Sequence, residues 1–226
     1  MNRLFDRSKM TYFPLATRRN KVSIEEACVD PHDQAIAIDR NMQEKTDLIA
    51  KQIIDARNVG ASVMCAFGAH AIKNGMGRLL GMMVEKGWLT HLATNGAGVI
   101  HDWEFAFQGF SSEDVKANVI EGKFGTWEET GLYLNTALAI GAYEGLGYGQ
   151  SIGAMIHNEG LFIPTRATLV SAGKDEDIPV SKRAAALALL AVLDVLDLPQ
   201  GFVPIEHPFA SYSVQEKCYV KQIPCT

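Results

Sequence analysis

Titratable side chains follow a run of small residues in the segment ATNGAGVIHD, at residues 93–102. His101 and Asp102 close this segment, and Glu104 comes two residues later. A histidine titrates near neutral pH, so it can exchange protons with a bound substrate. We therefore take His101 and Asp102 as candidate catalytic residues at the mouth of a crevice. The alternative is that His101 only caps or packs the start of a helix.

Two turns built from small residues are candidate cofactor sites. GAHAIKNG at residues 68–75 and TNGAGV at residues 94–99 each follow a short apolar segment. In an open parallel sheet, ligands bind beyond the carboxyl ends of the strands, where small residues let a backbone approach a phosphate or ribose. Two neighbouring strands that end in such turns predict one shared crevice. For TNGAGV the alternative is a tight turn with close helix packing, because the third glycine of the dinucleotide fingerprint is absent.

The elements around these turns have the order of a parallel crossover. SVMCAFG at residues 62–68 is short, apolar and bounded by glycine, which predicts a buried strand. A helix is expected at residues 71–87, ending at Gly87, and the next strand at residues 88–95. A strand, helix and strand of this length are typical of a right-handed parallel unit.

Helices dominate the rest of the expected structure, which is therefore α/β and helix-rich. Thr126 and Glu129 stand at the spacing of a capping box, and Gly147, Gly149 and Gly153 resemble a glycine loop. Because a helix precedes these glycines, we favour helix–helix packing for them. The predicted helices cover residues 36–58, 99–108, 111–122, 126–145, 147–158 and 182–197.

The composition argues against several classes of protein. With 226 residues, 47% of them hydrophobic, the chain can bury a sizeable core. Its net charge of −5 argues against nucleic acid or an anionic membrane as the main partner. The four cysteines form no CxxC pair and the histidines no metal-ligand spacing, so neither a disulfide framework nor a metal site is expected. No signal peptide is recognisable, and the longest apolar run is shorter than the roughly 20 residues of a membrane span, which favours a cytoplasmic protein.

A longer stretch around the second turn resembles a known family. TNGAGVIHDWEFAFQGFSSEDV, followed by GKFGTWEETGLYLN, is similar to the deoxyhypusine synthase family, in particular its bacterial deoxyhypusine synthase-like branch. The resemblance implies a Rossmann-like parallel sheet flanked by helices, with NAD as the cofactor. It also implies a homo-oligomer, a tetramer or dimer, with active sites at subunit interfaces. Such enzymes oxidise spermidine with NAD and pass its aminobutyl group, through an enzyme lysine imine, to an acceptor amine on a protein or a small molecule.

The resemblance assigns site residues one by one. An acidic residue that the family has near the nicotinamide falls on His101, with Asp102 beside it, which is a departure from the family. The family's imine-forming lysine follows a glycine, but the two Gly-Lys pairs, at Lys123 and Lys174, lie outside the context of that motif. The nucleotide-contacting turns fall on Gly68, Ala69 and His70, and on Thr94, Asn95, Gly96 and Ala97.

The leading hypothesis is an NAD-dependent transferase that moves an aminobutyl group from spermidine to an acceptor amine. One alternative is a catalytically silent, NAD-binding oligomeric relative, and another is an NAD-dependent enzyme that uses His101 as a base on a different amine. Residues 1–34 are expected to form an N-terminal arm and residues 35–226 the NAD-binding α/β domain. Because the chain ends in KQIPCT, where an apolar strand begins, we expect this domain to be incomplete at its C-terminus and inactive as a transferase. The alternative is a naturally short protein with an edge strand.

Overall fold

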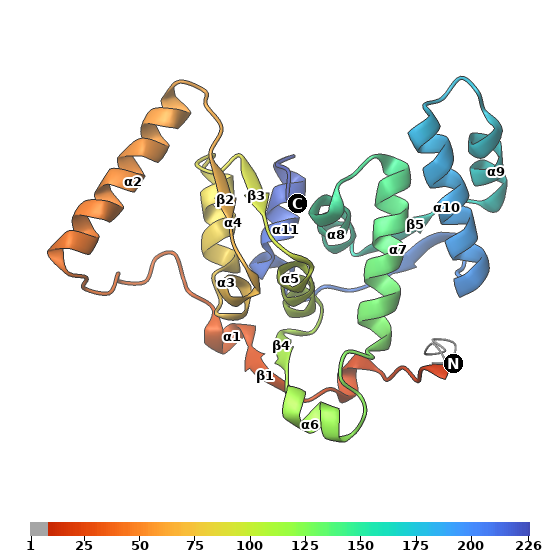
Figure 1. Ribbon diagram of the computed structural model, residues 1–226, viewed down its shortest axis with the longest axis horizontal. Helices are drawn as coiled ribbons and strands as arrows, with labels where there is room; N and C mark the ends of the chain where they lie inside the picture. Colours follow the sequence, from red (N-terminus) through yellow and green to blue (C-terminus); the bar gives the residue numbers. More distant parts are fainter. Residues whose placement is uncertain (1–8) are drawn as a thin grey trace, which may run out of the picture.

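A computed structural model describes residues 9–226 of the chain, and these residues form a helix-rich α/β structure with three small sheets (Figure 1). The helices are α1 (Ile24–Ala27), α2 (Arg40–Asn58), α3 (Ala69–Lys73), α4 (Gly77–Glu85), α5 (Gly96–Gln108), α6 (Val115–Ile120), α7 (Glu128–Glu144), α8 (Tyr148–His157), α9 (Arg166–Lys174), α10 (Val180–Leu196) and α11 (Val214–Val220), with single 3-10 turns at η2 (Leu15–Thr17) and η3 (Ala210–Tyr212). The strands are β1 (Asn20–Ser23), β2 (Met64–Ala66), β3 (His91–Ala93), β4 (Phe110–Glu113), β5 (Gly160–Ile163) and β6 (Gly201–Pro204). Within residues 9–226, no helix combines the length and the apolar character of a membrane span.

The order of the predicted strand–helix–strand unit is confirmed, with a break in its helix. The first strand was predicted to be buried, which is wrong, because none of residues 62–68 is buried and Met64 is 63% exposed. β2 and β3 are parallel, and Leu92 of β3 also forms a parallel bridge with Cys225. β3 therefore has a parallel neighbour on each side. The helix predicted at residues 71–87 is divided into α3 and α4, because Gly75 between them has a φ of +81°, which a helix does not allow.

The other two sheets in the described residues are antiparallel pairs, β1 with β4 and β5 with β6. An extended Rossmann-like parallel sheet is therefore not seen in residues 9–226. A helix had been predicted to begin at residue 111. Residues 111–113 instead belong to β4, because this segment pairs with β1. The following helix, α6, begins only after Asp114, whose Oδ1 accepts a hydrogen bond from Ala117 N at 3.1 Å.

Part of the expected N-terminal arm packs on this chain itself. Leu15 and Ile24 are almost fully buried, and Phe13 forms a parallel bridge with Trp127. These apolar side chains reach the core because the pairing of β1 with β4 holds the segment against it. Residues 1–8 of the expected arm lie outside the described residues.

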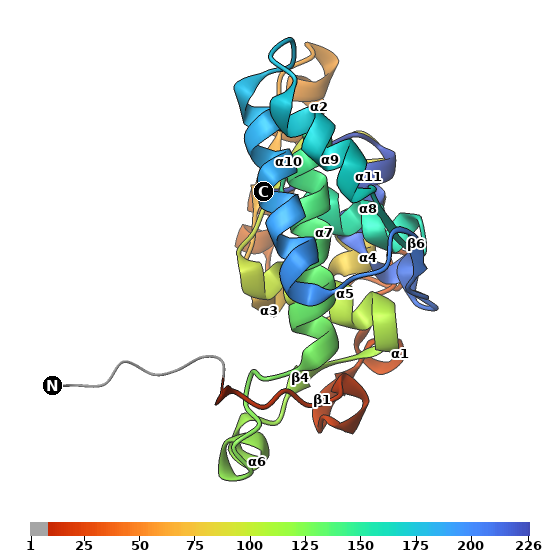
Figure 2. The ribbon, with the colours of Figure 1, turned by 90° about the vertical axis from the view of Figure 1, so that its right-hand side faces the viewer.

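The helix α5 stands between two hydrophobic clusters. Val99 and Trp103 pack in the larger cluster, with α7, α8 and α10, whereas Phe105 packs in the smaller cluster, with α4 and α11. Figure 1 shows α5 between these groups of helices, and Figure 2 shows α10 and α7 on the side of the larger cluster. α2 projects from this body and buries none of its residues (Figure 1). Because α5 begins at the second predicted turn, it carries His101 into the middle of the molecule.

His207 is a histidine buried beside the larger cluster. It is only 2% exposed, and Trp103 Nε1 donates a hydrogen bond to its Nε2 at 3.1 Å. The neutral ring accepts this hydrogen bond, whereas a protonated ring would meet the indole N–H with a second N–H. Burial lowers the pKa of His207 from 6.5 to about 4.

Acidification is expected to destabilise the fold through His207. The unfolded chain takes up this proton near pH 6.5 and the native chain only near pH 4, so stability is fully present above pH 6.5 and falls as the pH drops towards 4. The loss at pH 5 should be about 2 kcal/mol. Urea unfolding at pH 7 and pH 5 measures it in the parent, in His207→Gln and in the exposed control His32→Gln. Between pH 7 and pH 5, the free energy of unfolding of His207→Gln should fall by about 2 kcal/mol less than that of the parent and of His32→Gln. The same pH dependence in all three proteins would contradict the lowered pKa of His207.

Candidate functional site

The two predicted turns meet at the carboxyl ends of β2 and β3. Gly68 precedes α3 and Asn95 precedes α5, and a Cβ at Gly68 would lie 4.0 Å from Asn95 Nδ2. Asn95 Oδ1 caps α5 by accepting a hydrogen bond from Gly98 N at 2.9 Å. Gly96 and Ala97, the first residues of α5, are exposed at the positive end of the helix dipole. The turns thus lie next to each other, as their positions after neighbouring strands predict.

The two glycines of the second turn have different roles. A Cβ at Gly98 would lie 2.3 Å from Thr94 Oγ1, so this glycine is needed for close packing. A Cβ at Gly96 would meet only Tyr148 Oη, at 3.6 Å, so its outer face is open. Thr94 Oγ1 is buried and has no hydrogen-bond partner among the described residues, which is unusual for a hydroxyl. The packing alternative therefore holds for Gly98, whereas Gly96 lies where a ligand can approach the backbone.

The first turn continues into α3, which packs against α5. Ala69 is half-buried and His70 is exposed in the first turn of this helix. Burial is the main cause that lowers the pKa of His101, and the charges of Lys73 and His70 in this helix lower it further. Of the predicted residues of the first turn, His70 thus lies close enough to His101 for its charge to act there.

A cavity of about 380 Å³ lies beside the second turn, between α5, α7 and the N-terminal segment. Tyr148 connects the two, because it lines this cavity and its hydroxyl is the nearest group to the open face of Gly96. The side chains in its lining that could do chemistry are Arg18, His101, Glu104, Glu113, Trp127 and Thr130.

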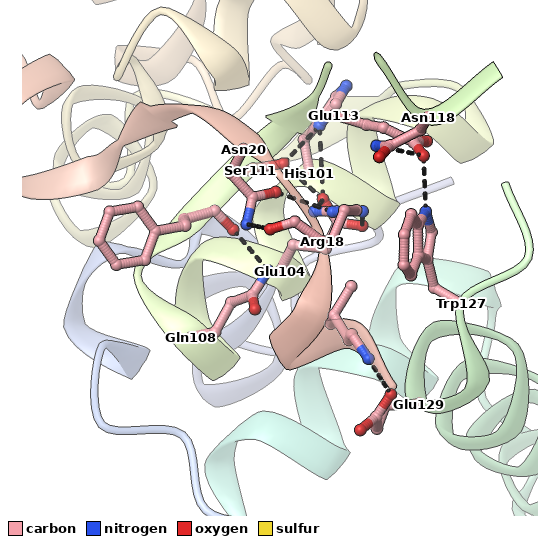
Figure 3. Close-up of polar contacts among 12 residues, drawn as sticks. Arg18, Asn20, His101, Glu104, Gln108, Ser111, Glu113, Asn118, Trp127 and Glu129 are labelled. Carbon is pink, nitrogen blue, oxygen red and sulfur yellow. Dashed lines mark hydrogen bonds and ion pairs between the residues drawn. The ribbon is translucent and has the colours of Figure 1, made fainter. Parts of the chain in front are cut away.

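A buried ion pair forms one side of the cavity (Figure 3). Arg18 Nη1 and Nη2 donate to Glu104 Oε1 and Oε2 at 2.5 and 2.7 Å, and both residues are less than one tenth exposed. Ser111 Oγ donates to Glu104 Oε2 at 2.5 Å and lies 2.6 Å from His101 Nδ1. These contacts join the N-terminal segment, α5 and β4 into one polar chain that ends at His101.

His101 is the predicted catalytic residue that the structure places in this cavity. Burial lowers the pKa of its imidazole, and the charges of Lys73, Arg18 and His70 lower it further, while Glu104 opposes them. The side chain keeps 20% of its surface exposed. His101 is therefore a neutral base near pH 7 that can still reach a ligand.

Asp102 is not at the crevice mouth, where the sequence had placed it. It is 2% exposed and accepts hydrogen bonds from Ser213 Oγ at 2.6 Å and from Val214 N at 3.1 Å. Successive residues on a helix point about 100° apart, so Asp102 faces α11 when His101 faces the cavity. Burial raises the pKa of Asp102, and its hydrogen bonds oppose that shift. Its role is to hold the start of α11, not to contact a ligand.

The acidic and aromatic groups of the cavity are also fixed. Glu113 Oε1 accepts hydrogen bonds from Trp127 Nε1 and from Asn118 Nδ2, each at 2.9 Å (Figure 3). The Arg18 guanidinium lies 5.8 Å from the centre of the Trp127 ring. Since Arg18 is neutralised by Glu104 and no ion pair joins Glu113 to a cation within residues 9–226, Glu113 contributes a negative charge to the lining.

The predicted capping box at the start of α7 does not form. Trp127 is the N-cap residue, and Thr126 Oγ1 donates to Lys123 O at 2.9 Å instead of capping the helix. Glu129 Oε2 accepts from Leu15 N at 2.6 Å (Figure 3). The glutamate is used to hold the N-terminal segment, which brings Arg18 to the cavity.

Neither lysine of the two Gly-Lys pairs lines the cavity. Lys123 Nζ contacts Glu121 Oε2 at 2.8 Å and lies 5.3 Å from the centre of the Phe13 ring. Lys174 ends α9, on the far side of α10 from α7 (Figures 1 and 2). Among the residues that line this cavity there is no lysine.

The sequence reasoning missed most of the residues around His101. Glu104, three residues after His101 on the same face of α5, was noted in the sequence, but its ion pair with Arg18 was not predicted. Arg18 and Ser111 reach the site through the pairing of β1 with β4, which no local pattern predicts. A comparison of the chain with protein-family models and with curated proteins found no match.

Proposed function

We propose that the chain binds NAD across the two turns and that it is related to the deoxyhypusine synthase family. The turns at residues 68–70 and 94–97 follow parallel strands, and their residues fit a dinucleotide because Gly96 leaves the start of α5 open and Thr94 Oγ1 lacks a partner. In this proposal β2, β3 and the isolated bridge at Cys225 are part of a Rossmann-like sheet.

The proposed substrate of the cavity is a cationic amine of the polyamine class. Glu113 supplies a carboxylate, and the aromatic rings of Trp127 and Tyr148 lie in the same lining, which suits an ammonium group. An anionic substrate would meet these groups unfavourably, because the charge of Arg18 is already used by Glu104. This lining, next to the open face of Gly96, is the observation that carries the proposed function.

The proposed reaction is NAD-dependent oxidation of the amine to an imine. NAD, when bound, supplies a hydride acceptor. His101 accepts the proton that the amine nitrogen loses, and Glu113 holds the substrate's cationic end. No lysine lines the cavity among the described residues, so these residues support the oxidation of the amine. This reaction is the one in which His101 acts as a base on an amine. Aminobutyl transfer to an acceptor is the extension that the family resemblance suggests.

Loss of NAD binding on substitution of Gly96 tests the cofactor site. Gly96→Val should weaken NAD binding at least about tenfold, since one charge-assisted hydrogen bond from the backbone is worth that much. The fold should be unaffected, because a Cβ there makes only an ordinary contact at 3.6 Å. Calorimetry measures the affinity, and Ala50→Val in α2, a helix that buries none of its residues, is the matched control. Equal affinities in a folded Gly96→Val variant would exclude this site.

The same samples, mixed with NAD and spermidine, distinguish the three functions. Lasting formation of NADH is the expected result and supports amine oxidation. Release of diaminopropane without net NADH, once an acceptor amine is added, would instead identify the transferase. NAD binding with neither product would identify a silent relative and contradict the proposed chemistry.

A further inference from the structure

We propose that Ser111, held by Glu104, fixes the position of the proton on His101, so that Nδ1 carries it and Nε2 is the proton acceptor. Ser111 is then a positioning residue, and Glu104 and Arg18 act through it. The polar chain that supports this begins at Arg18 and ends at His101 (Figure 3). The position of each proton follows from which groups can donate and which can only accept, taken in the order Glu104, Ser111, His101.

Glu104 must be a carboxylate. Both of its oxygens accept from the guanidinium of Arg18, at 2.5 and 2.7 Å, and a guanidinium is always protonated in proteins. Arg18 is 8% exposed, so a neutral Glu104 would leave a buried cation without a counter-charge. Glu104 can therefore only accept hydrogen bonds.

Ser111 must give its single proton to Glu104. The two oxygens lie 2.5 Å apart, and the carboxylate has no proton to offer. The hydroxyl of Ser111 therefore has only lone pairs left for His101, whose Nδ1 lies 2.6 Å away. That contact is a hydrogen bond only if Nδ1–H donates.

A neutral His101 with a proton on Nδ1 has a free lone pair on Nε2. Nδ1 is turned to β4, where Ser111 lies, and the partly exposed side chain of His101 lines the cavity. The charged groups that face the ring are Glu104 on its own helix, Arg18 from the N-terminal segment, and His70 and Lys73 from α3. Burial and the three basic groups outweigh Glu104 and favour the neutral ring. The catalytic consequence, proton uptake by Nε2 from a bound amine, rests on the proposed function, whereas the position of the proton does not.

Nitrogen NMR of the histidine rings tests the proton position directly. In the 15N-labelled full chain at pH 7, long-range 1H–15N spectra should show His101 with Nδ1 protonated and Nε2 unprotonated, the signals being assigned by their loss in His101→Gln. Ser111→Ala should give a mixture of tautomers with partial protonation of Nε2. Ser112→Ala, a neighbour in the same strand that is also buried, should leave the pattern unchanged. A parent spectrum with the proton on Nε2, or a Ser111→Ala spectrum like that of the parent, would overturn the proposal.

Kinetics give a second readout. With NAD and spermidine, Ser111→Ala should lower kcat for NADH formation about tenfold and move its pH profile, with KM little changed, while Ser112→Ala behaves like the parent. An unchanged kcat and pH profile in Ser111→Ala would count against the positioning role. If the parent forms no NADH, the proposed function fails, and the NMR spectra still decide where His101 carries its proton.

Discussion

Replacing Asp102 with alanine is expected to lower the free energy of unfolding by about 3–5 kcal/mol, because several buried donors lose their acceptor at about 1–3 kcal/mol each. Its carboxylate is buried and accepts four hydrogen bonds. The donors are Ser213 Oγ at 2.6 Å, Val214 N at 3.1 Å, Gln215 N at 3.2 Å and Gln215 Nε2 at 3.0 Å. In the variant these buried donors keep their desolvation cost but lose their acceptor. The start of α11 would lose its attachment to α5.

Asp114→Ala is the matched control, since Asp114 also accepts a backbone amide at a helix start. It accepts from Ala117 N at 3.1 Å and is not buried, so its loss should cost less than the loss of Asp102. Urea unfolding of the parent and the two variants measures both losses. If Asp102→Ala lost no more than Asp114→Ala, the buried network would not be a main attachment of α11. NAD affinity of folded Asp102→Ala should stay within a few-fold of the parent, because Asp102 belongs to neither turn and its buried side chain faces α11.

The parallel unit could be predicted because its signals are local. β2 and β3 are short apolar segments that end at small residues, and the helix start at Gly96 follows directly from its turn. The antiparallel pairs could not be predicted in this way. Residues 110–113 form β4 because residues 20–23 pair with them. No pattern in either segment indicates which other segment it pairs with. The same limit explains why part of the expected arm is in the core.

The sequence located the candidate site, but it did not show which of two neighbouring residues faces the cavity. His101 and Asp102 were both assigned to the site because they are adjacent in the sequence. A helix separates adjacent positions by about 100°, so one side chain reaches the cavity and the other reaches α11. Arg18 lies 86 residues from Glu104, and only the tertiary fold joins them. Such a contact has no signature in a single sequence.

The last prediction concerns Gly153, where close helix packing was favoured over a glycine loop, and the structure confirms that packing. A Cβ at Gly153 would lie 2.3 Å from Gln215 O and 2.9 Å from Tyr219 Cβ, both in α11. These neighbours cannot give way cheaply, since one is backbone and the other is the base of a side chain. Gly153→Ala should therefore push α8 and α11 apart and cost about 3 kcal/mol or more.

Gly131→Ala is the control for the change in helix propensity. Gly131 lies inside α7 with nothing within 4 Å of its Cβ, so alanine there should be neutral or stabilising by up to about 1 kcal/mol. Urea unfolding measures both variants, and the yield of folded protein is the readout if Gly153→Ala is too unstable for titration. Similar stability in the two variants would mean that α8 and α11 are not in backbone contact.

The double variant Asp102→Ala with Gly153→Ala tests whether both changes act on the same helix. Gln215 connects them, because its amide and side chain donate to Asp102 while its carbonyl oxygen contacts the Gly153 position. Once Asp102→Ala has released the start of α11, the helix can move away from the added methyl group at lower cost. The combined loss should therefore be smaller than the sum of the two single losses by about 1 kcal/mol or more. Strictly additive losses would show that α5 and α8 hold α11 independently.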